Sequence, residues 1–260
     1  MRRVPRWIHL PALLGVALIL IGPLAIIVRM PWGIFVSSVT SPDSVAALRL
    51  GVVTAVVSTV VCVVLGVPMA IVFARYDGVV VRVVRALVLL PLVLPPVVGG
   101  VALLYALGRY GLVGQYLDRV GITLAFTTPA VVIAQTFVAL PFLVLSVEGA
   151  LRSGDQGFER IAATLGASPT RTLWRVTLPM ARPALLAGGV LAFARALGEF
   201  GATITFAGNL PGTTQTAPLK IYLDAINDPS QALPLALVLM VVALVIVVGV
   251  HLRRSTVVAA

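Results

Sequence analysis

Long apolar runs, repeated along the whole chain, are the feature that most restricts how this sequence can fold. A helix needs about 20 predominantly apolar residues to cross the hydrocarbon core of a bilayer. Of the 260 residues, 60% are apolar and 11% are charged, far from the composition of a soluble domain. We therefore expect an all-α polytopic membrane protein that forms a single transmembrane domain over residues 1–260. The six expected spans are residues 8–28, 45–74, 86–107, 129–147, 184–206 and 233–252.

The basic residues indicate which ends of these spans face the cytoplasm. If the N-terminus lies inside, 13 of the 19 Lys and Arg residues fall in inner segments and only 4 in outer loops. Cytoplasmic loops carry such an excess of basic residues, so both termini and the loop 148–182 are predicted to be cytoplasmic. The first run is too long for a secretory signal and lacks a small-x-small cleavage site before Arg29, so we interpret it as a span.

The loop between the fourth and fifth spans is predicted to form two short helices joined by a turn. Ser153 and Gln156 have the spacing of a capping box at the first helix start. Gly166 lies where a helix-ending residue with positive φ is expected, and Ser168–Pro169 can cap and start the second helix. The apolar residues of the first helix recur at helical spacing and so share one face: Phe158, Ile161, Ala162 and Leu165.

Prolines interrupt the third expected span. Pro91, Pro95 and Pro96 lack the N–H that continues a helix, so they are expected to break its hydrogen-bond ladder. Such breaks persist in membranes where neighbouring helices or a water-filled cavity satisfy the freed carbonyl groups. Both a pathway-lining role and a simple packing kink fit this pattern.

The fifth span contains an ionisable pair. Arg195 and Glu199 are four residues apart and can therefore pair on one helical turn. Charges inside a span are costly and face a protein interior or a water-filled space, which predicts a pathway or gate role, while a self-neutralising pair is the alternative. Glu199 is the only acidic residue that we place within a span. Small and hydroxylated residues accompany the pair and share the predicted role: Gly198, Gly201, Thr203 and Thr205.

Several functional classes lack their sequence signature. The only lysine, Lys220, is followed by Ile221, so no Walker A motif exists, and a partner would have to bind any ATP. No nucleophile–base set or metal-ligand spacing is evident, and we predict neither catalytic nor metal-binding residues. The net charge of +10 is not clustered with aromatic residues, which argues against nucleic-acid binding. A single cysteine, Cys62, excludes an internal disulfide.

Residues 160–179 resemble the cytoplasmic EAA loop of ABC importer permeases, whose form is E-A-A-x-x-x-G followed later by L-P. Gly166 matches the glycine and Leu178–Pro179 match the closing pair. The E-A-A positions hold Arg160, Ile161 and Ala162, and Glu159 lies one place early. The resemblance implies the type I importer architecture and a coupling helix that docks on a separate ATPase subunit. The coupling residues it implies are Glu159, Ala162, Ala163, Leu165 and Gly166.

A second stretch resembles one particular group of ABC importer permeases. GEFGATITF at Gly198–Phe206 and N-x-P-G at Asn209–Gly212 closely resemble molybdate transporter permeases, as does LPLVLPP at Leu90–Pro96. Sulfate/thiosulfate permeases carry a related GE-aromatic-G segment. The resemblance implies a non-catalytic permease subunit that translocates molybdate or tungstate, with a sulfate/thiosulfate permease as the alternative. An ion-coupled secondary anion carrier is the alternative from another class.

The same resemblance implies the partners. The permease would pair with a second copy of itself in the bilayer and bind two ABC ATPase subunits, which would hold ATP and Mg²⁺. An extracytoplasmic oxyanion-binding protein would deliver the cargo, and this chain itself would bind no cofactor. Pro95, Pro96 and the Arg195–Glu199 segment would line or gate the pathway.

Overall fold

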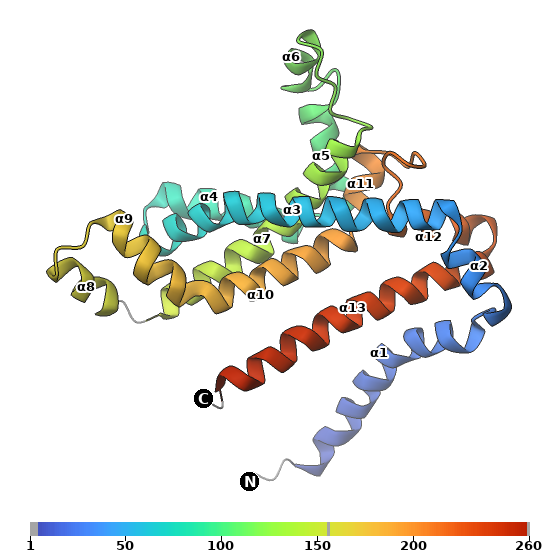
Figure 1. Cartoon of the computed structure of the whole chain (residues 1–260), viewed down its shortest axis with the longest axis horizontal. Helices are drawn as coiled ribbons and strands as arrows, with labels where there is room; N and C mark the ends of the chain where they lie inside the picture. Colours follow the sequence, from blue (N-terminus) through green and yellow to red (C-terminus); the bar gives the residue numbers. More distant parts are fainter. Residues whose placement is uncertain (1–4, 155–156, 259–260) are drawn as a thin grey trace.

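The computed structural model describes residues 5–154 and 157–258, and every regular element in them is helical. Three long helices lie side by side, and a fourth runs next to them (Figure 1). These are α3 (Pro42–Arg75), α7 (Thr128–Ser153), α10 (Leu178–Leu197) and α13 (Pro229–Val258).

Small residues let the three central helices approach closely. The core between α3, α7 and α10 contains fully buried alanines and the buried Cys62. A Cβ atom added at Gly66 of α3 would lie 2.7 Å from Leu143 Cδ2, and one at Gly188 of α10 would lie 2.9 Å from Ser146 Cβ. Close backbone contact over small residues is the usual way in which membrane helices pack.

The N-terminal helix α1 (His9–Arg29) has no buried residue and contacts α13 beside the central helices. Short elements η2 (Trp32–Ile34) and α2 (Phe35–Val39) connect it to α3. The start of α1 and the end of α13 lie toward the same end of the bundle as α8 (Gly157–Thr164) and α9 (Pro169–Thr172), and α12 (Ala217–Asn227) lies at the other end (Figure 1).

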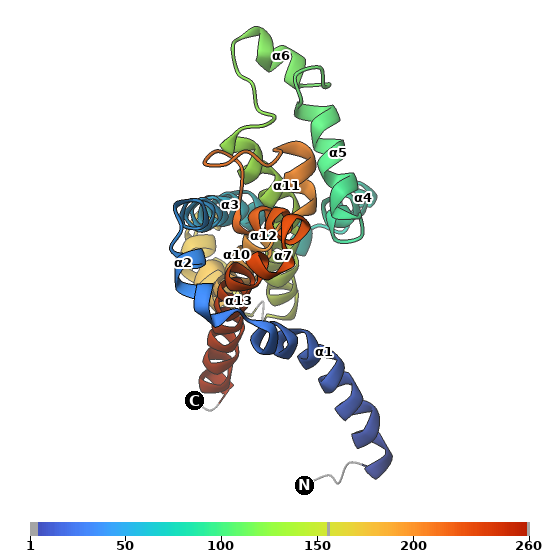
Figure 2. The same cartoon turned by 90° about the vertical axis from the view of Figure 1, so that its right-hand side faces the viewer.

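The third expected span, residues 86–107, is not one helix. Helix α4 (Val79–Leu89) and the turn η3 (Leu90–Leu92) end before α5 (Pro96–Leu107), and the two parts are bent by 117°. The predicted proline break is confirmed, but its size turns α5 and α6 (Gly114–Arg119) out of the bundle, as both views show (Figure 2). Within the described residues, five helices are long and apolar enough to cross a membrane, or six if the bent pair counts as one span.

The fourth and fifth expected spans also have different bounds. Helix α7 continues to Ser153, six residues beyond the expected end at 147. Helix α10 begins at Leu178 and ends at Leu197, and a separate short helix α11 (Gly201–Phe206) follows. The single expected span 184–206 is therefore broken at residues 198–200, the point where Gly198 and Glu199 stand.

Candidate functional site

The breaks in the third and fifth spans lie against each other. Pro95 caps α5 and Pro96 is its first residue, and α5 packs on α11. A Cβ added at Gly201, the first residue of α11, would lie 2.8 Å from Pro96 Cβ and 3.2 Å from the Val97 nitrogen. Three residues that the sequence singled out, Pro95, Pro96 and Gly201, thus lie at one junction between two broken helices. Gly198 follows the end of α10, and a Cβ added there would meet only the Ala194 carbonyl oxygen within 4 Å.

A second glycine allows this contact from the α5 side. A Cβ added at Gly100 would overlap Thr205 Oγ1 and lie 2.7 Å from the Ala202 carbonyl oxygen. Because two of its nearest atoms belong to the backbone of α11, no side-chain rotation could make room. The α5–α11 contact therefore depends on glycines at both helices, and Gly100 is a residue that the sequence reasoning missed.

The Arg195–Glu199 pair forms as its spacing predicted. The Glu199 carboxylate is 1% exposed, and its Oε2 lies 2.6 Å from Arg195 Nη1 as an ion pair. Its other oxygen, Oε1, accepts a hydrogen bond from the Ala202 N–H at 2.7 Å. This bond satisfies one of the free N–H groups of the first turn of α11. Glu199 therefore links the end of α10 to the start of α11 and stabilises the break between them.

The two threonines of α11 differ in their hydrogen bonds. The Thr205 hydroxyl donates to the Gly201 and Ala202 carbonyl groups at 3.0 and 3.2 Å. Thr203 is fully buried, and its hydroxyl has no hydrogen-bond partner within residues 5–154 and 157–258. A buried hydroxyl without a partner is costly, so the Thr203 hydroxyl keeps an unused capacity to form a hydrogen bond.

The loop before α10 folds into an elbow, which we define as residues 157–177. Gly166 ends α8 with φ of +78°, and the Ser168 hydroxyl accepts from the Arg171 N–H at 3.4 Å, so both local predictions are confirmed. Helix α9 is not separate, because the π-helical turn η4 (Leu173–Thr177) carries it directly into α10. The segment from Pro169 to Leu197 is thus one continuous helix.

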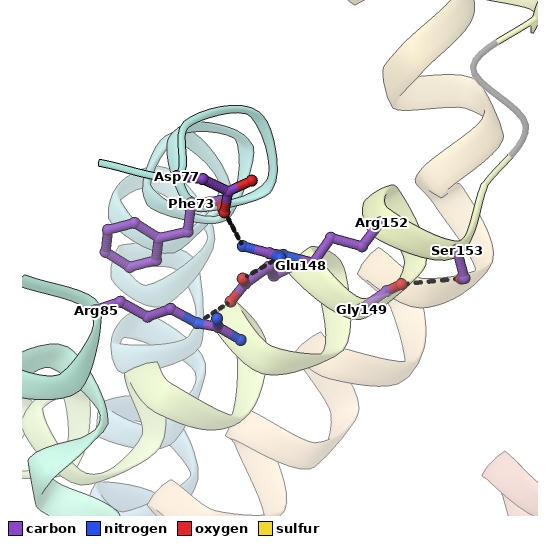
Figure 3. Close-up of polar contacts among 7 residues, drawn as sticks. All are labelled: Phe73, Asp77, Arg85, Glu148, Gly149, Arg152 and Ser153. Atoms are coloured by element: carbon purple, nitrogen blue, oxygen red, sulfur yellow. Dashed lines mark hydrogen bonds and ion pairs between the residues drawn. The ribbon is translucent and has the colours of Figure 1, made fainter. Parts of the chain in front are cut away.

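Ser153, the expected cap of the first elbow helix, belongs to the preceding helix instead. This residue is the last of α7, where its hydroxyl donates to the Gly149 carbonyl group at 2.9 Å (Figure 3). Its expected partner, Gln156, lies outside the described residues. The difference arises because α7 runs beyond the apolar run into the polar segment, where hydropathy no longer marks a helix.

The coupling residues are divided between two sides of the elbow. Leu165 is 82% exposed, and Phe158, Ile161 and Ala163 are also exposed, so they are open to a partner. Ala162 is half-buried. Glu159 points toward its own chain, where its carboxylate pairs with Arg75 Nη2 at 2.9 Å and accepts from the Thr177 hydroxyl. Glu159 therefore fastens α8 to the ends of α3 and η4, a geometry that the sequence did not indicate.

Sequence reasoning also missed a buried carboxylate. Glu148 lies just beyond the expected fourth span, yet its side chain is 1% exposed between Arg85 and Arg152. Arg85 and Arg152 are two of the inner basic residues that indicate topology. Glu199 is not the only buried acid within a spanning helix, because Glu148 is another. The spacing of Glu148 and Arg152, four residues apart, was the available signal. Among the described residues, no group of three or more His, Cys, Asp or Glu side chains could hold a metal ion.

The fold, the two broken spans and the elbow define the membrane component of a transport system. The family of binding-protein-dependent transport system inner membrane components matches residues 62–255, and the chain belongs to this family. The bacterial ABC transporter that imports the acidic polysaccharide alginate has the same fold, with a TM-score of 0.71 at 20% identity over 95% of this chain and 94% of that chain. The predicted type I importer architecture is thus confirmed.

Two relatives are more specific. The chain is 56% identical to the molybdenum transport system permease protein ModB of Mycobacterium tuberculosis, over 96% of this chain and 95% of the relative. It is 34% identical to the sulfate transport system permease protein CysT of Salmonella typhimurium, over 94% and 90% of the two chains. The predicted membership of the ABC importer permeases is confirmed, and the roles of the individual site residues stay predictions.

Proposed function

We propose that this chain is the membrane subunit of an ATP-driven importer that moves molybdate, or the similar oxyanion tungstate, into the cytoplasm. Support for the cargo comes from the 56% identity to ModB across nearly the whole of both chains. The lower identity of 34% to CysT favours molybdate over sulfate or thiosulfate.

The structure of the elbow is the main support for the proposed transport mechanism. Its exposed apolar residues Phe158, Ile161 and Leu165 lie at one end of the bundle, on a segment that continues through η4 into α10. Exposed apolar patches on such a segment favour a protein partner, and we assign this surface to an ABC ATPase subunit that binds ATP and Mg²⁺. The elbow end is then cytoplasmic, together with both termini.

The arm formed by α5 and α6 supports a homodimer. It leaves the bundle at a steep angle to the long helices (Figure 2). In a bilayer crossed by those helices, it would extend sideways from them. Its end carries Arg109 and Asp118, paired at 3.1 Å, and the 92% exposed Tyr110. Charges and free backbone groups are excluded from lipid, so a second copy of the chain would cover the arm. Two copies then bind two ATPase subunits, and an extracytoplasmic binding protein delivers the oxyanion to the other end.

The two facing breaks are the proposed gate. ATP binding would draw the elbows together, α10 would carry this movement to Arg195 and Glu199, and the α5–α11 junction at Pro95 and Pro96 would open. Hydroxyl groups such as those of Thr203 and Thr205 suit an oxyanion, because they donate hydrogen bonds without the tight hold of a full charge.

Uptake into proteoliposomes tests this function. The chain is reconstituted with the ATPase and the binding protein proposed as its partners, and uptake of molybdate, tungstate and sulfate is measured with and without internal ATP. We expect molybdate uptake that requires ATP and survives a proton ionophore. Uptake that requires an ion gradient and no ATP would instead identify a secondary carrier, and a preference for sulfate would refute the assigned cargo.

Gly166→Asp tests the elbow. The variant adds a charged side chain to the proposed docking surface, and we expect uptake and ATPase copurification to fall about tenfold or more, the scale of a lost interface hot spot. Gly212→Asp is the matched control, because Gly212 also has a positive φ (+73°) and open space around it but lies beyond the other end of α10. Normal copurification of the ATPase with Gly166→Asp would contradict the assignment.

A further inference from the structure

The buried carboxylate of Glu148 joins two helices, α7 and α4. It lies one turn before the end of α7, with Oε1 at 2.9 Å from Arg152 Nε on the same helix and Oε2 at 3.1 Å from Arg85 Nε on α4 (Figure 3). The contact to Arg85 is an ion pair without the alignment of a hydrogen bond. One carboxylate thus pairs with two guanidinium groups from different helices.

Arg152 extends the same network to the end of α3. Its Nη2 donates to the Phe73 carbonyl oxygen at 2.7 Å and lies 3.4 Å from Asp77 Oδ1 (Figure 3). Phe73 is in the last turn of α3, where carbonyl groups lack helical partners and attract cations. The ends of α3 and α7 and the middle of α4 therefore meet at one charge cluster, which we call the Glu148 joint.

The ion pairs of the Glu148 joint oppose separation of α4 from α7. Removing one member of a buried ion pair leaves an uncompensated charge, and here the loss of Glu148 would leave Arg85 and Arg152 facing each other. Arg85 is the only member of the joint that comes from α4. Its side chain is one third exposed, so it can be solvated when its partner is lost.

The Glu148 joint lies close, along the chain, to both the elbow and the break in the third span. Glu148 precedes the elbow by only nine residues, counting to Gly157. Arg85 precedes the break that begins at Leu90, beyond which α5 packs on α11. The joint thus stands between the elbow and the broken third span, on a path that does not use α10.

We propose that Glu148 is a positioning residue for energy coupling: it locks α4 to α7, so that movement of the elbow reaches the break at Pro95 and Pro96 from the α4 side. This inference rests on the proposed importer function. Transport then needs both halves of the gate to move, α11 through α10 and α5 through α4. A merely structural joint would support the fold and leave the cargo moved per ATP unchanged.

Arg85→Gln is the decisive variant. It removes the link to α4 but keeps the Glu148–Arg152 pair and the bond to Phe73, so the ends of α3 and α7 remain joined. Arg82→Gln is the matched control on the same helix, because Arg82 is exposed and no ion pair in the described residues includes it. Arg85→Lys keeps the charge and should rescue the loss in part.

The measurement is made on the reconstituted complex with ATPase and binding protein. ATP hydrolysis and molybdate uptake are measured together for the wild type, which must show ATP-dependent uptake, and then for each variant. We expect Arg85→Gln to hydrolyse ATP within about twofold of the wild-type rate while the molybdate moved per ATP falls about tenfold, a typical coupling between two sites. The double variant Arg85→Gln/Glu148→Gln should be no worse than Glu148→Gln alone, since the two residues act as a unit.

Two results would overturn the inference while the importer function stands. One is wild-type uptake together with a wild-type rate of ATP hydrolysis in Arg85→Gln. The other is an equal fall of uptake and hydrolysis, which would indicate a structural role. Absence of ATP-dependent uptake in the wild type would refute the proposed function itself, and this inference with it.

Discussion

Two buried glutamates, Glu148 and Glu199, invite comparison because each is 1% exposed and each pairs with an arginine four residues away. They differ in the groups with which their carboxylates interact. Glu199 satisfies the charge of Arg195 and the N–H of Ala202, both within a few residues of itself. Glu148 satisfies Arg152 and the distant Arg85, and through Arg152 it reaches α3. The same local motif thus stabilises a break in one place and a junction of helices in another.

The comparison predicts the largest effect for loss of the Glu148 charge. Glu148→Gln leaves two arginines around one buried amide, and we expect a loss of about 3–5 kcal/mol, as for other broken buried pairs. Glu199→Gln should cost less, because it leaves one arginine, Arg195, without its partner instead of two. Thermal unfolding of the purified protein in detergent, with Arg82→Gln as the control, measures both. Equal shifts in Tm would remove the distinction between the two sites.

The second prediction concerns the packing around Glu199. Gly100→Ala would force a methyl group against backbone atoms of α11, and we expect a cost of about 3 kcal/mol, the upper end of the range for overpacking, together with loss of uptake. Thr205→Ala should not rescue it, because the Ala202 carbonyl oxygen still blocks the methyl group.

Gly189→Ala is the control for this substitution, since a Cβ at Gly189 meets no atom within 4 Å and alanine favours a helix. Full uptake by Gly100→Ala would show that the α5–α11 contact is not needed for transport. Rescue by Thr205→Ala would show that the side chain, and not the backbone, sets the limit.

The third prediction separates the two tasks of Glu199. Glu199→Gln removes the charge but keeps an oxygen that can accept from the Ala202 N–H, whereas Glu199→Ala removes both. Because Ala202 is fully buried, the alanine variant should be less stable than the glutamine variant by about 1–2 kcal/mol, the cost of an unsatisfied buried donor. Chemical or thermal unfolding of the two variants checks this difference. If the two unfold alike, the bond to Ala202 does not stabilise the break.

The same two glutamates show what the sequence could predict and where it failed. Glu199 was visible because it interrupts an apolar run, and its partner lies on the same helical turn. Glu148 stands at the edge of a run, where charges are common, and its second partner Arg85 is close only in the folded chain. The turn at Gly166 and the cap at Ser168 could be predicted for the same reason as the Glu199 pair. Each of these features depends on residues that are close together in the sequence.

The bend between α4 and α5 could be predicted from the sequence only in part. Proline chemistry predicted that the ladder would break near Pro95 and Pro96. The size of the bend, 117°, depends on how closely α5 can approach α11 over Gly100 and Gly201, and this contact joins segments far apart in the sequence. Local chemistry therefore predicted the position of the break, and long-range packing decided its direction.

The smallest expected effect belongs to Asp228, an exposed carboxylate that does for α13 what the buried Glu199 does for α11. Its Oδ1 accepts from the Ser230 hydroxyl and N–H at 2.7 and 2.9 Å, and these bonds lower the pKa of the carboxyl group below its usual value. A lowered pKa in the folded state contributes stability above the unfolded-state pKa, and this contribution is lost as the pH falls through the folded-state pKa. Asp228→Asn keeps a capping oxygen and does not titrate. The Tm difference between wild type and Asp228→Asn should thus shrink or reverse as the pH falls from neutral into the acidic range, by a small amount because water surrounds the group. A difference independent of pH would show that the Asp228 charge does not stabilise the start of α13.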